Sequence, residues 1–238
     1  MRVLRWGQSQ ALFSGEPVAV KGDSVTLKFD LAIFDCDGVL VDSMAISNGT
    51  LVEMLGELGV TVSLQESNAL YMGRSLPVII EDVSDRFGVS VPHGFPDEYY
   101  VRMEAAFRKG LRPVQGVIKA LDKITLPKCV ASSAPHRKMN TTLRVTGLMD
   151  RFEGCIFSAA DVGRGKPFPD LFLYAARQMG AQAHRCVVIE DAVPGVQAAV
   201  SAGMSVFGYA ADSDGDSLRE AGATVFDDMA NLPDLLEE

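Results

Sequence analysis

Residues 31–43 read LAIFDCDGVLVDS, an apolar run that ends in two acidic residues, Asp35 and Asp37, with Gly38 directly after them. The run is typical of a buried strand, and two carboxylates at its end are costly to bury unless a cation or a reaction requires them. In open α/β sheets, ligands bind at the carboxyl ends of the strands. The stretch therefore predicts an acidic, metal-dependent site, although a strand followed by an ordinary Asp-Gly turn would also explain it.

The chain of 238 residues has the composition of an ordinary globular protein, with 47% hydrophobic and 22% charged residues. This length accommodates one domain with a smaller domain inserted into it. The net charge of −9 argues against nucleic acid as a partner, because neutralising phosphates requires a basic patch. A small phosphorylated molecule is compatible with this charge, since a local group of lysine, backbone N–H and metal is enough to bind it.

The sequence predicts a cytoplasmic protein without a membrane partner, either a monomer or a homodimer. No apolar run has membrane-spanning length, and the first residues lack the continuous apolar segment of a secretory signal. Four scattered cysteines without CxxC spacing are expected as free thiols rather than as a disulfide framework or a zinc site. Residues 1–27 are expected to form an N-terminal extension, to which the sequence assigns no role.

A helical unit follows the first strand. Apolar spacing and glycine or proline separators predict a strand over 28–34 and helices over 43–58, 63–72, 75–88 and 96–110. Ser43 is expected to cap the first of these helices. The unit is large enough to be a small α-helical cap domain, which we assign to residues 47–112.

After Pro113 the pattern changes to helices that alternate with apolar strand-like runs. The runs lie at 128–131, 154–157, 186–189, 205–208 and 223–226. Such alternation predicts an α/β fold, a Rossmann-like parallel sheet covered by helices on both faces. We assign this core to residues 28–46 and 113–238, with the helical unit inserted after its first strand.

Polar residues also mark three later segments of the chain. They are Ser132 after the run at 128–131, Lys166 in a GKPFPD segment that opens a helix, and Glu190 and Asp191 after the run at 186–189. Parallel strands place their carboxyl ends along one edge of a sheet, so these side chains are expected to converge on Asp35 and Asp37. Each alone has a simpler explanation, as a strand end, a solvated lysine or an acidic pair at a helix N-terminus. Their combination favours a functional site.

The ordered set DxDGxLxDS, hydrophobic-Ser, GKPxPD and hydrophobic-EDxxxG resembles the four motifs of the haloacid dehalogenase-like superfamily. The resemblance covers about residues 28–210. The helical unit resembles the small α-helical cap that one class of this superfamily carries between its first and second motifs. The nearest branch is the one that holds β-phosphoglucomutase and small sugar-phosphate phosphatases.

The resemblance assigns a role to each residue of the set. Asp35 would be the nucleophile that forms an aspartyl-phosphate, and Asp37 the general acid and then the base. Ser132 and Lys166 would bind the phosphoryl group. Mg²⁺ would be held by Asp35, the backbone carbonyl of Asp37 and Asp191, with Glu190 as a further ligand or as a partner of the ligands.

The resemblance also favours one reaction over another. An acid at Asp37 fits a phosphatase or a mutase and not a dehalogenase of this superfamily. Mutase relatives carry a histidine in the cap linker, where this chain has Ser47, and an arginine and a lysine in the cap, where it has Leu76 and about Pro96. The expected function is therefore hydrolysis of a sugar, sugar-acid or polyol phosphate. A mutase and a non-catalytic phospho-ligand-binding module remain the alternatives.

Arg74 is the residue of the helical unit that we expect to set substrate specificity. It lies in Gly73-Arg74-Ser75, where the cap loop of the superfamily meets the substrate. A surface arginine at the start of a helix would equally account for its position.

Overall fold

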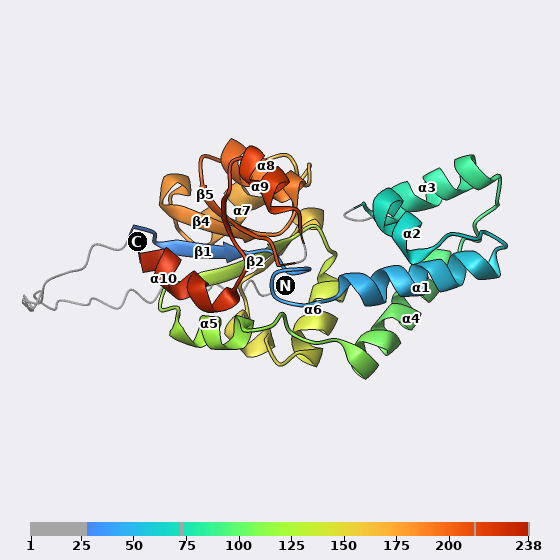
Figure 1. Cartoon of the computed structure of the whole chain (residues 1–238), viewed down its shortest axis with the longest axis horizontal. Coiled ribbons are helices and arrows are strands. Elements are labelled where there is room, and N and C mark those ends of the chain that lie inside the picture. Colours follow the sequence, from blue (N-terminus) through green and yellow to red (C-terminus); the bar gives the residue numbers. More distant parts are fainter. Residues whose placement is uncertain (1–27, 72–73, 212, 238) are drawn as a thin grey trace, which may run out of the picture.

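The computed structural model describes residues 28–71, 74–211 and 213–237. Within these residues a parallel sheet of six strands has the order β3-β2-β1-β4-β5-β6. Figure 1 labels β1, β2, β4 and β5 of this sheet. The strands are β1 (Leu31–Phe34), β2 (Lys128–Ser132), β3 (Ile156–Ser158), β4 (Cys186–Glu190), β5 (Ser205–Tyr209) and β6 (Thr224–Phe226). The predicted α/β fold with a parallel sheet is confirmed.

Helices cover both faces of the sheet, as the apolar strands require. Along β1, Ala32 and Phe34 belong to one apolar core, whereas Leu31 and Ile33 belong to the other. The first core takes side chains from α5, α6 and α10, and the second from α7, α8 and α9. These helices are α5 (Val117–Lys123), α6 (His136–Val145), α7 (Asp170–Gln178), α8 (Val193–Ser201), α9 (Gly215–Glu220) and α10 (Leu232–Glu237). Single 3₁₀ turns lie at Met149–Arg151, Ala159–Asp161, Ala183–Arg185 and Met229–Asn231.

Of the five described helices between β1 and β2 in the chain, the first four lie to one side of the sheet (Figure 1). They are α1 (Met44–Glu57), α2 (Leu64–Tyr71), α3 (Leu76–Phe87) and α4 (Phe95–Gly110). We call them the helical insert. The insert has its own apolar core, which includes Leu51 and Leu55 of α1, Ile79 and Val83 of α3, and Phe95 of α4. This core is what allows the insert to hold a shape of its own.

Helix α4 connects the insert to the sheet. Phe95 at its start lies in the core of the insert. Met103 and Phe107, about one turn apart, lie in the first of the two sheet cores, the one that α5, α6 and α10 cover. Both of these side chains are fully buried. Because one helix contributes to both cores, the sheet and the insert are packed against each other through α4 as well as joined by the chain.

Several local predictions differ from the structure. The first strand begins at Leu31 and not at residue 28, and α10 was not predicted. Ser43 occupies the N-cap position of α1, but its oxygen accepts no capping hydrogen bond from the first turn. The side chain points to Asp37, to which its hydroxyl donates. The predicted N-terminal extension, residues 1–27, lies outside the described residues.

All four cysteines are free, as predicted. Among the helices that the structure describes, none is both long and apolar enough to cross a bilayer.

Candidate active site

Three of the predicted site residues lie side by side at the carboxyl edge of the sheet because of the strand register. Phe34 of β1 pairs with Val130 of β2 on one side and with Ile189 of β4 on the other. Asp35 is the next residue after β1, Glu190 ends β4, and Ser132 ends β2. Parallel pairing therefore brings these residues together from positions far apart in the sequence.

Lys166 reaches into the same edge from the turn ahead of α7. Its ammonium donates to Asp35 Oδ1 at 2.6 Å and to Glu190 Oε1 at 2.5 Å. Its side chain is 7% exposed and lies 5.0 Å from the ring centroid of Phe172. Although burial lowers the pKa of Lys166, the charges of Asp35 and Glu190 outweigh that effect and raise it, so the amine is held as a cation. The alternative of a solvated loop lysine is wrong.

Glu190 is held by donors on both carboxylate oxygens. Oε1 accepts from Lys166, and Oε2 accepts from the backbone N–H groups of Asp191 and Ala192, each at 2.9 Å. The side chain is buried against the first turn of α8, where a Cβ on Gly195 would lie 1.8 Å from Oε1. Glycine at residue 195 is therefore required for Glu190 to lie in this position.

The carboxylates form a buried acidic cluster. Oxygen atoms of Asp35, Glu190 and Asp191 all lie within 4.8 Å of one another. Burial raises the pKa of Asp35 to about 7. The charge of Lys166 opposes this shift, and the charges of Glu190 and Asp37 add to it. Burial and the charge of Glu190 also raise the pKa of Asp191 well above its ordinary value. Both raised pKa values indicate that the cluster, when its carboxylates are ionised, carries more negative charge than Lys166 compensates.

A hard divalent cation fits this cluster. When all are ionised, Asp35, Glu190 and Asp191 carry three negative charges, and among the described residues Lys166 supplies one positive charge in direct contact. A divalent ion would compensate the remaining two charges, and carboxylate oxygens are the ligands that Mg²⁺ prefers. The donor set contains oxygen alone, which matches Mg²⁺ better than a softer metal.

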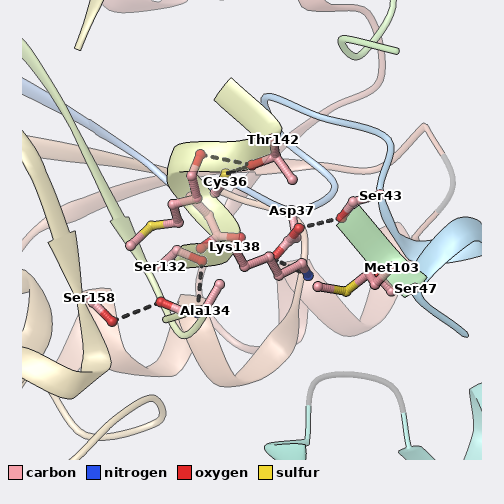
Figure 2. A network of polar contacts seen from close by, with 12 residues as sticks. Cys36, Asp37, Ser43, Ser47, Met103, Ser132, Ala134, Lys138, Thr142 and Ser158 are labelled. Atoms are coloured by element: carbon pink, nitrogen blue, oxygen red, sulfur yellow. Dashed lines mark hydrogen bonds and ion pairs between the residues drawn. The ribbon is translucent and has the colours of Figure 1, made fainter. Parts of the chain in front are cut away.

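Asp37 lies apart from this cluster and is bound by two other residues (Figure 2). The hydroxyl of Ser43 donates to Oδ1, and the ammonium of Lys138 donates to Oδ2 at 2.9 Å. Burial lowers the pKa of Lys138, but the charge and hydrogen bond of Asp37 more than offset this and raise it. Sequence reasoning missed Lys138. Its place in the first turn of the helix that follows Ser132 put it near the carboxyl edge of the sheet, but no sequence pattern indicated its contact with Asp37.

Ser132 is positioned by a short chain of hydrogen bonds (Figure 2). It is 2% exposed, and its Oγ accepts from the backbone N–H of Ala134 at 3.2 Å. The carbonyl of Ala134 accepts in turn from Ser158 Oγ at 2.8 Å. A hydroxyl has one donor and two acceptor sites, so this contact leaves the O–H of Ser132 able to donate to an anion.

Arg74 is not brought to these residues in this structure. Its side chain is exposed ahead of α3, and its backbone N–H donates to the carbonyl of Tyr71 at 3.1 Å. Within residues 28–71, 74–211 and 213–237, no hydrogen bond or ion pair joins Arg74 to the acidic cluster, Asp37 or Ser132. Its assignment to specificity stays a prediction.

Comparisons with known proteins agree with this arrangement. A model of the haloacid dehalogenase-like hydrolase family matches residues 29–203. The chain is 33% identical over 210 residues to the 6-phosphogluconate phosphatase of Escherichia coli, covering 87% of this chain and 95% of that protein. It is 29% identical to the fructose-1-phosphate phosphatase of the same bacterium, over 72% of this chain and 92% of that one.

A solved structure shows the same fold with an anion bound. It is a HAD family hydrolase from Deinococcus radiodurans with bound phosphate and sodium, which is 30% identical and superposes with a TM-score of 0.71 over 87% of this chain and 94% of that one. The family match spans the strand ends that carry Asp35, Ser132 and Glu190, and the loop that carries Lys166. The family model and the identity to the first relative show the family, and this chain is an enzyme of the haloacid dehalogenase-like hydrolase family.

Proposed function

We propose that this hydrolase is a Mg²⁺-dependent phosphatase that acts on a small phosphorylated metabolite through an aspartyl-phosphate intermediate. The observation that carries the proposal is the separation of two neighbouring carboxylates. Asp35 lies in the acidic cluster and is bonded to Lys166, whereas Asp37 is bonded to Ser43 and Lys138. Transfer of a phosphoryl group to a carboxylate needs this division, because one group attacks while another moves protons.

In the first half of the reaction, a carboxylate oxygen of Asp35 attacks phosphorus, and the bond between phosphorus and the ester oxygen breaks. The leaving oxygen takes a proton from the carboxyl group of Asp37. Lys166 holds the nucleophile in place and contributes positive charge near the phosphoryl oxygens. Ser132 donates its hydroxyl to one of those oxygens.

In the second half, a water molecule attacks phosphorus and gives a proton to Asp37, which is now ionised. The bond between phosphorus and Asp35 breaks, and inorganic phosphate leaves. Asp35 returns as a carboxylate and Asp37 as a carboxylic acid, so the cycle closes without any further reactant.

Asp35, Asp191 and the backbone carbonyl of Asp37 would hold Mg²⁺. When bound, the ion would offset the repulsion among the carboxylates and the charge of the phosphoryl oxygens. Glu190 already accepts hydrogen bonds on both oxygens, and we therefore assign it to holding Lys166 and the turn at Asp191 rather than to a ligand position.

We propose a phosphorylated sugar, sugar acid or polyol as the substrate. Two relatives are phosphatases of 6-phosphogluconate and of fructose 1-phosphate, which are small phosphorylated sugars or sugar acids. In this proposal the helical insert is the cap, with boundaries at 47–112, and Arg74 on its loop contacts a hydroxyl or carboxylate of the substrate. The free cysteines fit a reducing cytoplasm, in which the enzyme would act as a monomer or homodimer.

The test is phosphate release from a panel of sugar, sugar-acid, polyol and nucleotide monophosphates, with Mg²⁺ and with a chelator. We expect turnover of at least one sugar or sugar-acid phosphate, loss of that turnover in Asp35→Asn, and normal turnover in Asp234→Asn, an exposed aspartate of α10. Release of phosphate by Asp35→Asn at the wild-type rate would contradict the proposal. Isomer formation from a hexose 1-phosphate and a bisphosphate primer, without phosphate release, would support the mutase alternative.

A further inference from the structure

We propose that Lys138 is a positioning residue that fixes the carboxyl group of Asp37 toward the leaving oxygen of the substrate. The inference rests on the proposed phosphatase function and adds a residue to it. Lys138 lies in the first turn of α6, 101 positions from Asp37 in the sequence, and its Nζ donates to Asp37 Oδ2 at 2.9 Å.

The contact restrains the carboxylate because each of its oxygens has its own donor. Ser43 donates to Oδ1 from the start of α1, and Lys138 donates to Oδ2 from α6 (Figure 2). Rotation of the carboxylate about its last torsion angle would stretch both bonds. Ser43 is fully buried, so its donor is itself fixed, and the pair of donors defines the plane of the carboxylate.

The burial of Lys138 also points to this role. Its side chain is 14% exposed and that of Asp37 is 16% exposed. A lysine loses hydration at this exposure and needs a partner of opposite charge to compensate. Asp37 is the acidic group within ion-pair distance of Lys138 among the residues that the structure describes. The ammonium of Lys138 is therefore a largely buried charge whose partner is the side chain of Asp37.

The turn that carries Lys138 is anchored to the helical insert. The guanidinium of Arg137, the preceding residue, donates to Glu104 of α4 at 2.6 Å and lies 5.5 Å from the ring centroid of Tyr100. Helices α4 and α6 therefore hold Lys138 at the junction between the sheet and the insert. The contact ties the turn that carries Lys138 to α4, and a positioning residue needs such a fixed support.

The consequence for the reaction depends on the leaving group. An alkoxide from a sugar phosphate needs a proton as it leaves, and the donor must be aligned with it. A 4-nitrophenolate ion is stable without a proton, so its departure does not need an aligned acid. Loss of Lys138 is therefore expected to slow the cleavage of sugar phosphates much more than that of 4-nitrophenyl phosphate.

The experiment compares kcat/KM for the best-hydrolysed sugar phosphate of the panel and for 4-nitrophenyl phosphate in wild type, Lys138→Met and Lys138→Arg. This parameter covers the steps up to phosphorylation of the enzyme, so the later hydrolysis does not enter. We expect the ratio of the two values to fall about tenfold or more in Lys138→Met and to recover in part in Lys138→Arg. Lys119→Met, the same change at an exposed lysine of α5, should leave the ratio unchanged.

Each outcome decides the question. A merely structural role would lower both values by the same factor, and an unchanged ratio in Lys138→Met would overturn the proposal. If Lys138→Met does not fold, Lys138→Gln, which keeps a polar side chain, carries the same comparison. Absence of turnover by the wild type on both substrates would instead overturn the phosphatase function itself, so the two failures are distinguishable.

Discussion

Gly38 leaves the space that the carboxylate of Asp191 occupies: a Cβ atom at residue 38 would lie 1.9 Å from Asp191 Oδ2. Gly38 also has a φ of +81°, which side chains rarely adopt. The turn after the first motif and the acidic end of β4 therefore pack together only with glycine at residue 38. Both the missing Cβ and the positive φ favour glycine at this position.

Gly38→Ala is expected to displace Asp191 and to weaken Mg²⁺ binding and phosphate release by tenfold or more, about 1.4 kcal/mol. Gly59→Ala is the matched control, because Gly59 has the same φ of +81° but open space around it. Both variants should lose about 1–2 kcal/mol of unfolding free energy from backbone strain. Calorimetric titration with Mg²⁺ separates them, and equal loss of Mg²⁺ affinity in both would contradict the explanation.

Gly195→Ala is expected to move Glu190, since the new Cβ would lie 1.8 Å from its Oε1. Lys166 would lose one of its two partners, and both stability and activity should fall. Gly56→Ala, in an exposed part of α1 with open space, should instead stabilise the protein by about 0.5–1 kcal/mol. Urea unfolding of both variants checks this, and a stabilised Gly195→Ala would show that Glu190 is free to shift.

Lys166→Met is expected to cost about 3–5 kcal/mol of unfolding free energy, because Asp35 and Glu190 would share a buried site without their cation. The double variant Lys166→Met, Glu190→Gln should cost less than the sum of the two single variants, since the second change removes one of the stranded charges. Urea unfolding in a chelator measures all three. Strictly additive losses would mean that the ion pair contributes nothing of its own.

The metal-free protein is expected to become less stable as the pH rises from about 4 to 7 through this site. The pKa of Asp35 is raised from 3.8 to about 7 by burial, so in this range the folded state binds more protons than the unfolded state. Unfolding free energy therefore falls with rising pH and has lost this contribution above about pH 7. Asp191, whose pKa is also raised, acts in the same direction.

Thermal unfolding in a chelator at pH 5 and pH 8 tests this dependence. The melting temperature should fall between the two values more in wild type than in Asp35→Asn, which lacks the titrating group. Mg²⁺ should restore stability at pH 8 far more than at pH 5, because protons compete with the ion for the carboxylates. Equal pH dependence in wild type and Asp35→Asn would show that the cluster does not control it.

The sheet and its acidic edge could be predicted because each signal is local. Asp35, Glu190 and Ser132 directly follow or end apolar strands, and parallel pairing then determines that they meet. The contact of Lys166 with both carboxylates needed the motif as well, since its loop follows no strand pattern. The fold class was therefore readable from periodicity, and the site from the order of its motifs.

The surroundings of Asp37 could not be predicted in this way. Lys138 reaches Asp37 only because α6 packs beside β1 with its first turn at the carboxyl edge, which is a property of the packed helices. The side chain of Ser43 had two possible partners: backbone N–H groups in the first turn of α1, from which its oxygen could accept, and the carboxylate of Asp37, to which its hydroxyl donates. The charged partner is the one bound. Competition of this kind depends on the three-dimensional position of the acceptor.

The most direct test of the phosphatase mechanism is mass spectrometry of Asp37→Asn after rapid quenching with 4-nitrophenyl phosphate and Mg²⁺. This variant lacks the base for hydrolysis, but the substrate does not need an acid to react. We predict a phosphoryl group on the peptide that contains Asp35, and none when Asp35→Asn is added. Steady release of phosphate without any phosphoryl group on that peptide would contradict an aspartyl-phosphate intermediate at Asp35.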